Sequence, residues 1–382
     1  MKKILLSTVA VATMATAASA STSSDIKALK AQMMSMAEKI EALEAKEAKE
    51  EKVKEVATVK EHKVPVLEFS GKHYLGFVSD SESDTNEFET RRNYLQVKGF
   101  FADNPKSYMR ITLDTFHNDE DDGDDEGSWE VRLKYAFLYL DSILPYTGVE
   151  IGQAHRPWID HEEHGGWNYR SISKVFVEDG NGAHLTNSAD LGVNFKTKTP
   201  YFSSELGLFN GEGYHGVEDG EGLSSEWRLT AHLLGTGKEK RKDKVTYADV
   251  SFFGQWNEVS NKHGNEDLNW YGVHAVYNQP IFLIAAQYVA TEDAANIALG
   301  STKDYAGEGW SVNGEIRPMK DFGIIGRYDC WELDSGTEKE RTIAGLTYQY
   351  NKNVEFIANW LKEEVGAETE TDALMLTTEV NW

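Results

Sequence analysis

Basic side chains recur at even spacing through four consecutive segments of the chain. Six of them share one parity within their segments: Arg92, Lys98, Arg110, Arg132, Lys134 and Arg156. Because successive side chains of a β-strand point to opposite faces, residues an even number of positions apart lie on one face. Guanidinium and ammonium groups gathered on one wall of a water-filled space attract anions. These residues therefore predict an anion-attracting strip.

A second interpretation of the same arginines involves no solute. Asp114, Glu130 and Glu150 lie in the same segments, and the arginines could pair with them and merely solvate the wall. In the first interpretation, by contrast, the basic strip would set a field across the space together with four acidic residues of later segments: Glu315, Asp329, Glu355 and Glu379. The sequence leaves both interpretations open.

Patterns typical of enzymes are missing from the sequence. It contains neither a Gly-x-Ser-x-Gly turn nor a glycine-rich phosphate loop between a strand and a helix. His161 and His164 are three residues apart, whereas the zinc protease helix needs a spacing of four. The acidic run 119–126 lacks the spacing of an EF-hand. We expect no metal, no cofactor and no catalysis, with an enzyme on the same scaffold as a rival class.

The elements that would position the basic residues are strands with a period of two. Sixteen candidates follow one another, at 66–78, 88–101, 106–117, 129–140, 148–156, 189–196, 201–210, 223–235, 245–257, 267–278, 281–290, 308–317, 322–333, 341–350, 353–363 and 373–382. Most alternate junctions are short and turn-like, and the intervening ones are mostly longer and acidic. This alternation is typical of a membrane barrel with both chain ends on the periplasmic side. We predict an all-β transmembrane β-barrel of about 16 antiparallel strands.

Parity also predicts which side chains face lipid. The outward sets are apolar, with aromatic residues near strand ends, as expected at the membrane interfaces. For the segment 129–140 the predicted outward set is Trp129, Val131, Leu133, Tyr135, Phe137 and Tyr139. In the last ten residues, Leu374 and Leu376 share the outward face with the terminal Trp382.

The junction 157–188 is far longer than the others and contains large apolar residues, among them Trp158, Trp167 and Phe176. An exposed loop rarely carries so many such groups. We predict that it folds back into the barrel and narrows the pore, with Arg170 and Lys174 at the constriction.

The N-terminus has the pattern of a secretory signal. Two lysines precede an apolar stretch that ends in Ala-Ser-Ala, so we expect cleavage after residue 20. Residues 21–63 contain a short heptad seam and a charged stretch, which predict a periplasmic coiled coil and linker. The alternative is a lone amphipathic helix or a disordered spacer. The barrel would then occupy 64–382. The net charge of −24 argues against a nucleic-acid partner.

Three segments carry a resemblance to a known family. Residues 91–99, 131–139 and 148–153 resemble the front half of the phosphate-selective porins, the O and P porin family. The resemblance implies a trimeric 16-stranded channel of the Gram-negative outer membrane, with a short N-terminal coil, an inward third loop and arginines that guide anions. Trp382 resembles the terminal aromatic residue by which the insertion machinery recognises such barrels. The expected function is passive diffusion of small hydrophilic solutes or ions; the alternative is a barrel with a plugged lumen, tethered to the periplasm by its coil.

Overall fold

The computed structural model describes residues 27, 30–31, 34–36, 38–39, 42, 66–117, 129–214, 222–235, 245–259, 268–294 and 306–382. The chain divides into two units, Met1–Pro65 and Val66–Trp382. In the first unit, each residue that the structure describes is helical. The predicted signal segment 1–20 lies outside the described residues, as does most of the predicted coil 21–63, so both stay predictions. Among the described residues no helix has the length and apolar character needed to cross a membrane.

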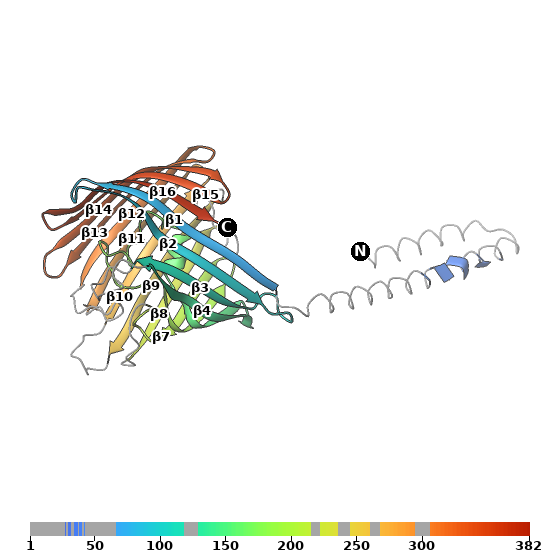
Figure 1. The fold of residues 1–382 in the computed structure, drawn as a ribbon. Coiled ribbons are helices and arrows are strands. Elements are labelled where there is room, and N and C mark those ends of the chain that lie inside the picture. Colours follow the sequence, from blue (N-terminus) through green and yellow to red (C-terminus); the bar gives the residue numbers. More distant parts are fainter. Residues whose placement is uncertain are drawn as a thin grey trace. The chain divides into compact units, whose positions relative to one another are not determined.

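The second unit is a closed antiparallel barrel, as predicted (Figure 1). Its strands are β1 (Val66–Asp80), β2 (Thr85–Phe100), β3 (Tyr108–His117), β4 (Trp129–Leu144), β5 (Thr147–His155), β6 (Ala189–Lys198), β7 (Phe202–Phe209), β8 (Gly222–Leu234), β9 (Tyr247–Val259), β10 (Leu268–Gln279), β11 (Phe282–Ala294), β12 (Gly307–Met319), β13 (Phe322–Leu333), β14 (Glu338–Asn351), β15 (Val354–Val365) and β16 (Glu368–Asn381). Each strand pairs with its neighbours in sequence, and β1 pairs with β16. A short helix, α3 (Ile159–Glu163), follows β5.

The seam between the first and last strands closes through the C-terminal residue. Gly71 N donates to the Trp382 carbonyl at 2.9 Å, and Trp382 N donates to the Gly71 carbonyl at 3.1 Å. On the outer face of β16, Leu374 and Leu376 are exposed, as their parity predicts. This outward apolar face is what a barrel presents to lipid.

Strand ends differ from the predicted ones in several places. The predicted long junctions 79–87, 334–340 and 364–372 are tight turns, because the strands on either side continue further than expected. The predicted junction 141–147 is likewise a tight turn after β4. The turn at 141–147 fits the predicted series of short connections, whereas the three shortened long junctions make the alternation of long and short connections less regular than predicted.

Candidate pore and its lining

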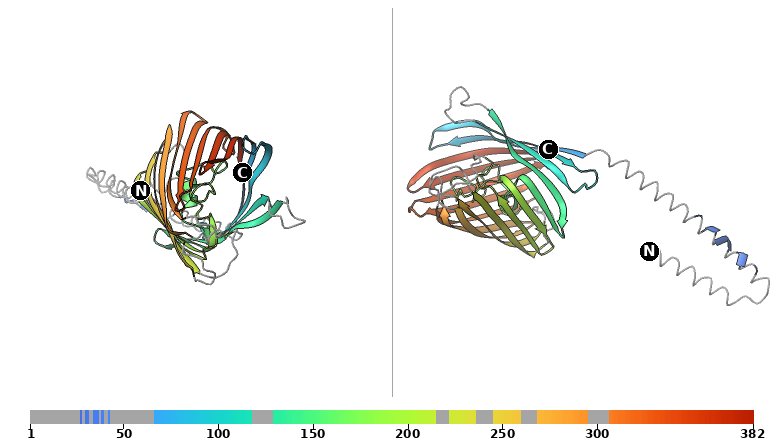
Figure 2. Two further views of the ribbon diagram at one scale, coloured as in Figure 1. Left: turned by 90° about the vertical axis from the view of Figure 1, so that its left-hand side faces the viewer. Right: turned by 90° about the horizontal axis from the view of Figure 1, so that it is seen from below.

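The connection between β5 and β6 lies inside the barrel, as predicted (Figure 2, left). Its apolar residues are buried in one cluster with residues of the inner wall: Trp158, Ile159, Trp167, Tyr169, Ile172, Val175, Phe176, Val177, Ala183 and Leu185 from the connection, and Phe253, Trp270, Val289, Ile325, Trp331, Ile343 and Ile357 from strands β9 to β15. The ring of Trp158 stacks on that of Phe253 with centroids 3.5 Å apart. Burial of this apolar area holds the loop against one side of the barrel.

Polar contacts from the wall fix the loop backbone. The Tyr247 hydroxyl donates to the Gly165 carbonyl at 2.9 Å, and Arg327 Nη1 donates to the Lys174 carbonyl at 2.8 Å. Backbone carbonyls in an irregular buried segment need such donors, because an unsatisfied buried acceptor is costly. The loop is therefore held by both its apolar side chains and its backbone.

An ion-pair cluster holds the tip of the loop. The Arg341 guanidinium pairs with Asp179 of the loop and with Asp329 of β13, with Nε 2.9 Å from the Asp329 carboxylate. Burial would raise the pKa of Asp179, but Arg341 outweighs it and lowers that pKa to about 2. The pair is thus fully charged at neutral pH and resists displacement of the tip.

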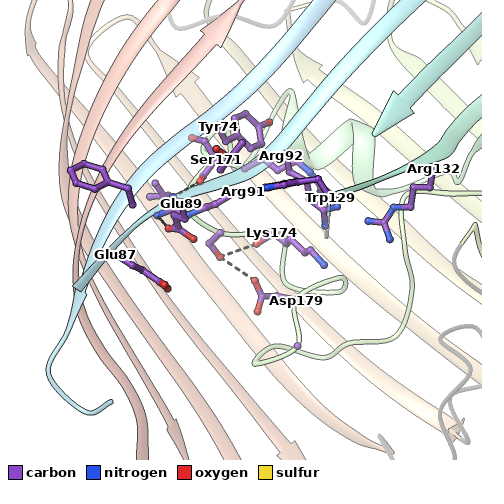
Figure 3. Close-up of a pocket in the computed structure, with 16 residues that line it drawn as sticks. Tyr74, Glu87, Glu89, Arg91, Arg92, Trp129, Arg132, Ser171, Lys174 and Asp179 are labelled. Carbon is purple, nitrogen blue, oxygen red and sulfur yellow. Dashed lines mark hydrogen bonds and ion pairs between the residues drawn. The ribbon is translucent and has the colours of Figure 1, made fainter. Parts of the chain in front are cut away.

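Opposite the packed face of the loop, two cavities remain along the wall made by β1 to β4. The larger is about 1000 Å³ and includes Arg92, Arg132 and the loop residue Lys174 in its lining (Figure 3). The smaller is about 360 Å³ and reaches the chain terminus at Trp382. Tyr74 and Arg170 line both cavities, so the narrowing predicted for this loop lies between them.

Arg170, one of the two predicted constriction residues, is held by two carboxylates of its own loop. Its Nη1 contacts Glu163, and its Nη1 and Nη2 donate to the two oxygens of Glu178 at 2.5 and 2.9 Å. Burial would raise the pKa of Glu178, but the Arg170 guanidinium outweighs it and lowers that pKa. Bidentate pairing of this kind fixes the guanidinium in one orientation.

A β-bulge in β4 changes the predicted lining. The pairing of β3 with β4 shifts between Thr112 and Leu113, which leaves Lys134 as an extra residue opposite the regular ladder. Leu133 is 43% exposed on the outer face, but Lys134 and Tyr135 are only 3% and 7% exposed. A bulge lets two successive residues point to the same side. Both side chains therefore face the lumen.

The prediction that Tyr135, Phe137 and Tyr139 face lipid is consequently wrong. Phe137 is fully buried, and the Tyr139 ring packs on the inward Tyr108 with centroids 5.1 Å apart. The residues before the bulge keep their predicted outward direction. One extra residue in the ladder reverses the parity of every position that follows it.

A second register shift, in the pairing of β1 with β2, adds one residue to the lumen lining that the alternation rule did not predict. Tyr74 pairs with Arg92 and Leu75 with Thr90, so Arg91 is the extra residue. Its Nη1 donates to the Ser171 carbonyl of the loop at 2.7 Å, and its side chain also pairs with Glu89. The tandem Arg91-Arg92 is a signal for such a bulge, because a regular strand would send one of two successive arginines into lipid.

The predicted basic residues fall into two groups, and the first is paired. Arg92 and Arg132 share the fully buried carboxylate of Asp114 at 2.8 and 3.2 Å, as the solvation interpretation predicts. Arg156 pairs with Glu226 beneath the loop and is not among the residues lining the two cavities. The prediction that Arg156 lines the pore is therefore wrong, because the loop covers it.

The second group makes no ion pair within the part of the chain that the structure describes. It comprises Lys98, Arg110, Lys134 and Lys174. Three of them lie over aromatic rings instead: Lys98 over Tyr108 at 5.3 Å, Arg110 over Tyr135 at 4.6 Å and Lys134 over Tyr94 at 4.6 Å. Cation–π contact stabilises a cation without neutralising its charge. Positive charge thus remains along the wall.

Residues of the segment His161–His164 make hydrogen bonds within the loop itself. Glu162 accepts from Trp158 Nε1 at 2.8 Å, and His164 Nδ1 lies 2.7 Å from the Asp160 carbonyl. Asp160 raises the pKa of His164. Across the described residues, no three His, Cys, Asp or Glu side chains are placed to hold a metal ion. The acidic run 119–126 lies outside the described residues.

No protein-family model and no curated protein matches the chain. Solved structures match it at low identity. In-vitro folded OmpT in its trimer form, an outer membrane protein of Vibrio cholerae, has a TM-score of 0.56 and 11% identity over 84% of this chain and all of that one. OmpF of Salmonella typhi has a TM-score of 0.58 and 14% identity over 83% and 97% of the two chains. A mutant of the Rh. blastica porin has a TM-score of 0.51 and 11% identity over 83% of this chain and all of that one. The chain has the barrel fold of these outer-membrane porins.

Proposed function

We propose that the protein is a porin of the Gram-negative outer membrane, through which small hydrophilic solutes and ions diffuse passively. The observation that carries the proposal is the position of the loop. It packs against the inner face of β9 to β15 and leaves two cavities, lined by charged and aromatic side chains, along β1 to β4. A 16-stranded barrel is wide enough to keep an aqueous path beside such a loop.

The charges of the wall support a preference for anions. Arg110, Lys134 and Lys174 line the cavities and make no ion pair among the described residues. Cations in a narrow space with low-dielectric walls raise the local concentration of anions. This favours the anion-attracting strip over wall solvation.

Maturation and assembly complete the proposal. Residues 1–20 would be removed as a signal peptide, 21–63 would lie in the periplasm, and 64–382 would form the barrel in outer-membrane lipid. A homotrimer is supported by the trimer form of OmpT among the similar structures. The terminal Trp382, exposed beside the β1–β16 seam, would be recognised by the insertion machinery.

One observation favours the alternative of a plugged, tethered barrel. The side chains of Tyr74 and Arg170 lie where the cavities meet, and Arg170 is fixed by two carboxylates. A rigid side chain at this point would block passage rather than filter it.

Single-channel recording of the purified mature protein in a planar bilayer separates these functions. Stepwise KCl conductance with an anion-signed reversal potential across a KCl gradient is the expected result. A cation-signed potential would contradict the anion preference alone. The absence of conductance would contradict the porin function and support the plugged barrel.

A further inference from the structure

Two cations of the smaller cavity stand outside the ion pairs of the described residues. Arg110 and Lys134 both line it, and neither makes an ion pair within the described chain. They share one aromatic ring, since Arg110 lies 4.6 Å and Lys134 5.6 Å from the centroid of Tyr135. The β4 bulge creates this arrangement by turning Lys134 and Tyr135 to the same side.

Lys134 is the more deeply placed of the two cations. It is 3% exposed, and its Nζ donates a hydrogen bond to the Tyr94 hydroxyl, 3.0 Å away. An ammonium has three donors, so donors remain for a further acceptor. Burying a charge without a counter-charge is costly, and an anion in the cavity would offset that cost.

Arg110 is fixed but not neutralised. Its Nε donates to the Thr112 hydroxyl at 3.0 Å, and its Nη1 lies 3.0 Å from His155 Nε2. These contacts orient the guanidinium plane against the Tyr135 ring and leave its other nitrogen without a hydrogen-bond partner among the described residues. A guanidinium held in this way is suited to bind a planar carboxylate.

The carboxylates that also line this cavity already have their own cations. Glu163 contacts Arg170, and Asp160 lies 3.5 Å from His164 Nδ1. Neither carboxylate forms an ion pair with Arg110 or Lys134. The lining contains four Lys or Arg side chains and two Asp or Glu side chains, so positive side chains are in excess.

The rest of the lining selects among anions. Rings of Tyr74, Tyr94 and Tyr135 also line the cavity, and the parts of these rings that the cations leave uncovered offer apolar surface to a bound molecule. Inorganic phosphate would leave these faces uncovered, and a neutral sugar would leave the cations without a counter-charge. The volume of about 360 Å³ lies at the lower end of the range of about 300 to 1000 Å³ for ligand pockets, which favours a single ring.

We propose that the smaller cavity is a binding site, on the permeation path, for small carboxylates that carry one flat ring; this rests on the proposed porin function. The carboxylate lies between Arg110 and Lys134, and the ring packs against the tyrosines.

Block of the KCl current tests the site. Sodium benzoate is titrated on one side of a bilayer that holds single channels of the full mature protein, and sodium acetate, sodium phosphate and benzyl alcohol are titrated separately. The half-blocking concentration of benzoate should be about tenfold lower than that of each comparator, because only benzoate combines the charge with the ring.

Three variants locate the block. Lys134→Met removes the charge with little change in length and should raise the half-blocking concentration of benzoate about tenfold. Tyr135→Leu should raise the benzoate value toward that of acetate and leave the acetate value unchanged. Lys106→Met is the matched control, because Lys106 has a 77% exposed side chain on the turn after β2, and its benzoate block should equal that of the wild type.

The outcomes separate the two proposals. If KCl steps appear and benzoate blocks no better than acetate, the site is refuted and the porin function stands. If the wild type gives no KCl steps, the porin function fails and the site fails with it. If Lys134→Met forms no channel, Arg110→Gln is used to remove a positive charge from the site instead. A half-blocking concentration of benzoate equal to that of the wild type in that variant refutes the site.

Discussion

Replacing Glu162 by glutamine should stabilise the protein at alkaline pH. Glu162 is 1% exposed, between the loop and the wall. Its two oxygens accept hydrogen bonds from Trp158 Nε1 at 2.8 Å and from Gln287 Nε2 at 2.5 Å. An amide keeps the shape of the side chain and has no charge to bury. The Gln287 carbonyl oxygen is buried without a hydrogen-bond partner in the described chain, so a flip of that amide would accept the new N–H.

The sign and size of the effect follow from the pKa of Glu162. Burial raises it from 4.5 to about 7, against the opposing effects of Arg327 and the two hydrogen bonds. Between these two pKa values the folded state therefore binds more protons than the unfolded state. The stability that depends on a neutral Glu162 carboxyl is fully present below pH 4.5 and is lost as the pH rises through about 7. At about 1.4 kcal/mol per pH unit, ionising Glu162 costs the folded protein about 3 kcal/mol.

Urea unfolding in detergent micelles, followed by tryptophan fluorescence, measures this difference. At pH 4.5 the wild type and Glu162→Gln should have similar free energies of unfolding, and at pH 8 the variant should be more stable by about 3 kcal/mol. Glu82→Gln, in the exposed turn after β1, is the matched control and should follow the wild type at both values. Equal pH dependence in the wild type and Glu162→Gln would refute the reasoning.

Two further predictions concern the wall. Asp114→Asn leaves Arg92 and Arg132 without their shared carboxylate, and a unit charge about 4 Å from a passing ion is worth about 1 kcal/mol in water. The chloride-to-potassium permeability ratio from reversal potentials should rise about fivefold; no rise would mean that these arginines do not face the ion path. Gly152→Ala should lower the free energy of unfolding in urea by about 1 to 3 kcal/mol, because Gly152 has a φ of +122° and an added Cβ would lie 2.4 Å from the Ala136 carbonyl oxygen. Unchanged stability would contradict it.

Several features could be predicted because each depends on composition or period within one segment. Alternation of apolar and polar residues predicted the 16 strands, and the outward direction of Leu374 and Leu376 followed from it. The apolar residues of 157–188, such as Trp158 and Phe176, predicted that this loop is buried inside the barrel. These signals are local, because burial of an apolar side chain does not depend on which partner covers it.

The pairing of charges was not predictable in the same way. Arg92 and Arg132 meet one carboxylate while Arg110 and Lys134 meet aromatic rings, although all four share the same parity in sequence. Arg156 has that parity too, but the loop covers it and Glu226 of β8 pairs with it. These contacts join residues that are far apart in the chain, so only the closed barrel brings them together.

The sequence by itself determined that this chain forms a barrel with an apolar outer face, a buried loop and a basic inner wall, since each follows from residue type and a period of two. The tertiary structure decided which charges stay unpaired and where β2 and β4 bulge. Register is set by cross-strand partners. In β4 both Lys134 and Tyr135 suit a lumen, so nothing in the local pattern marks the point where the parity reverses there, whereas the tandem Arg91-Arg92 is a local signal for the bulge in β2.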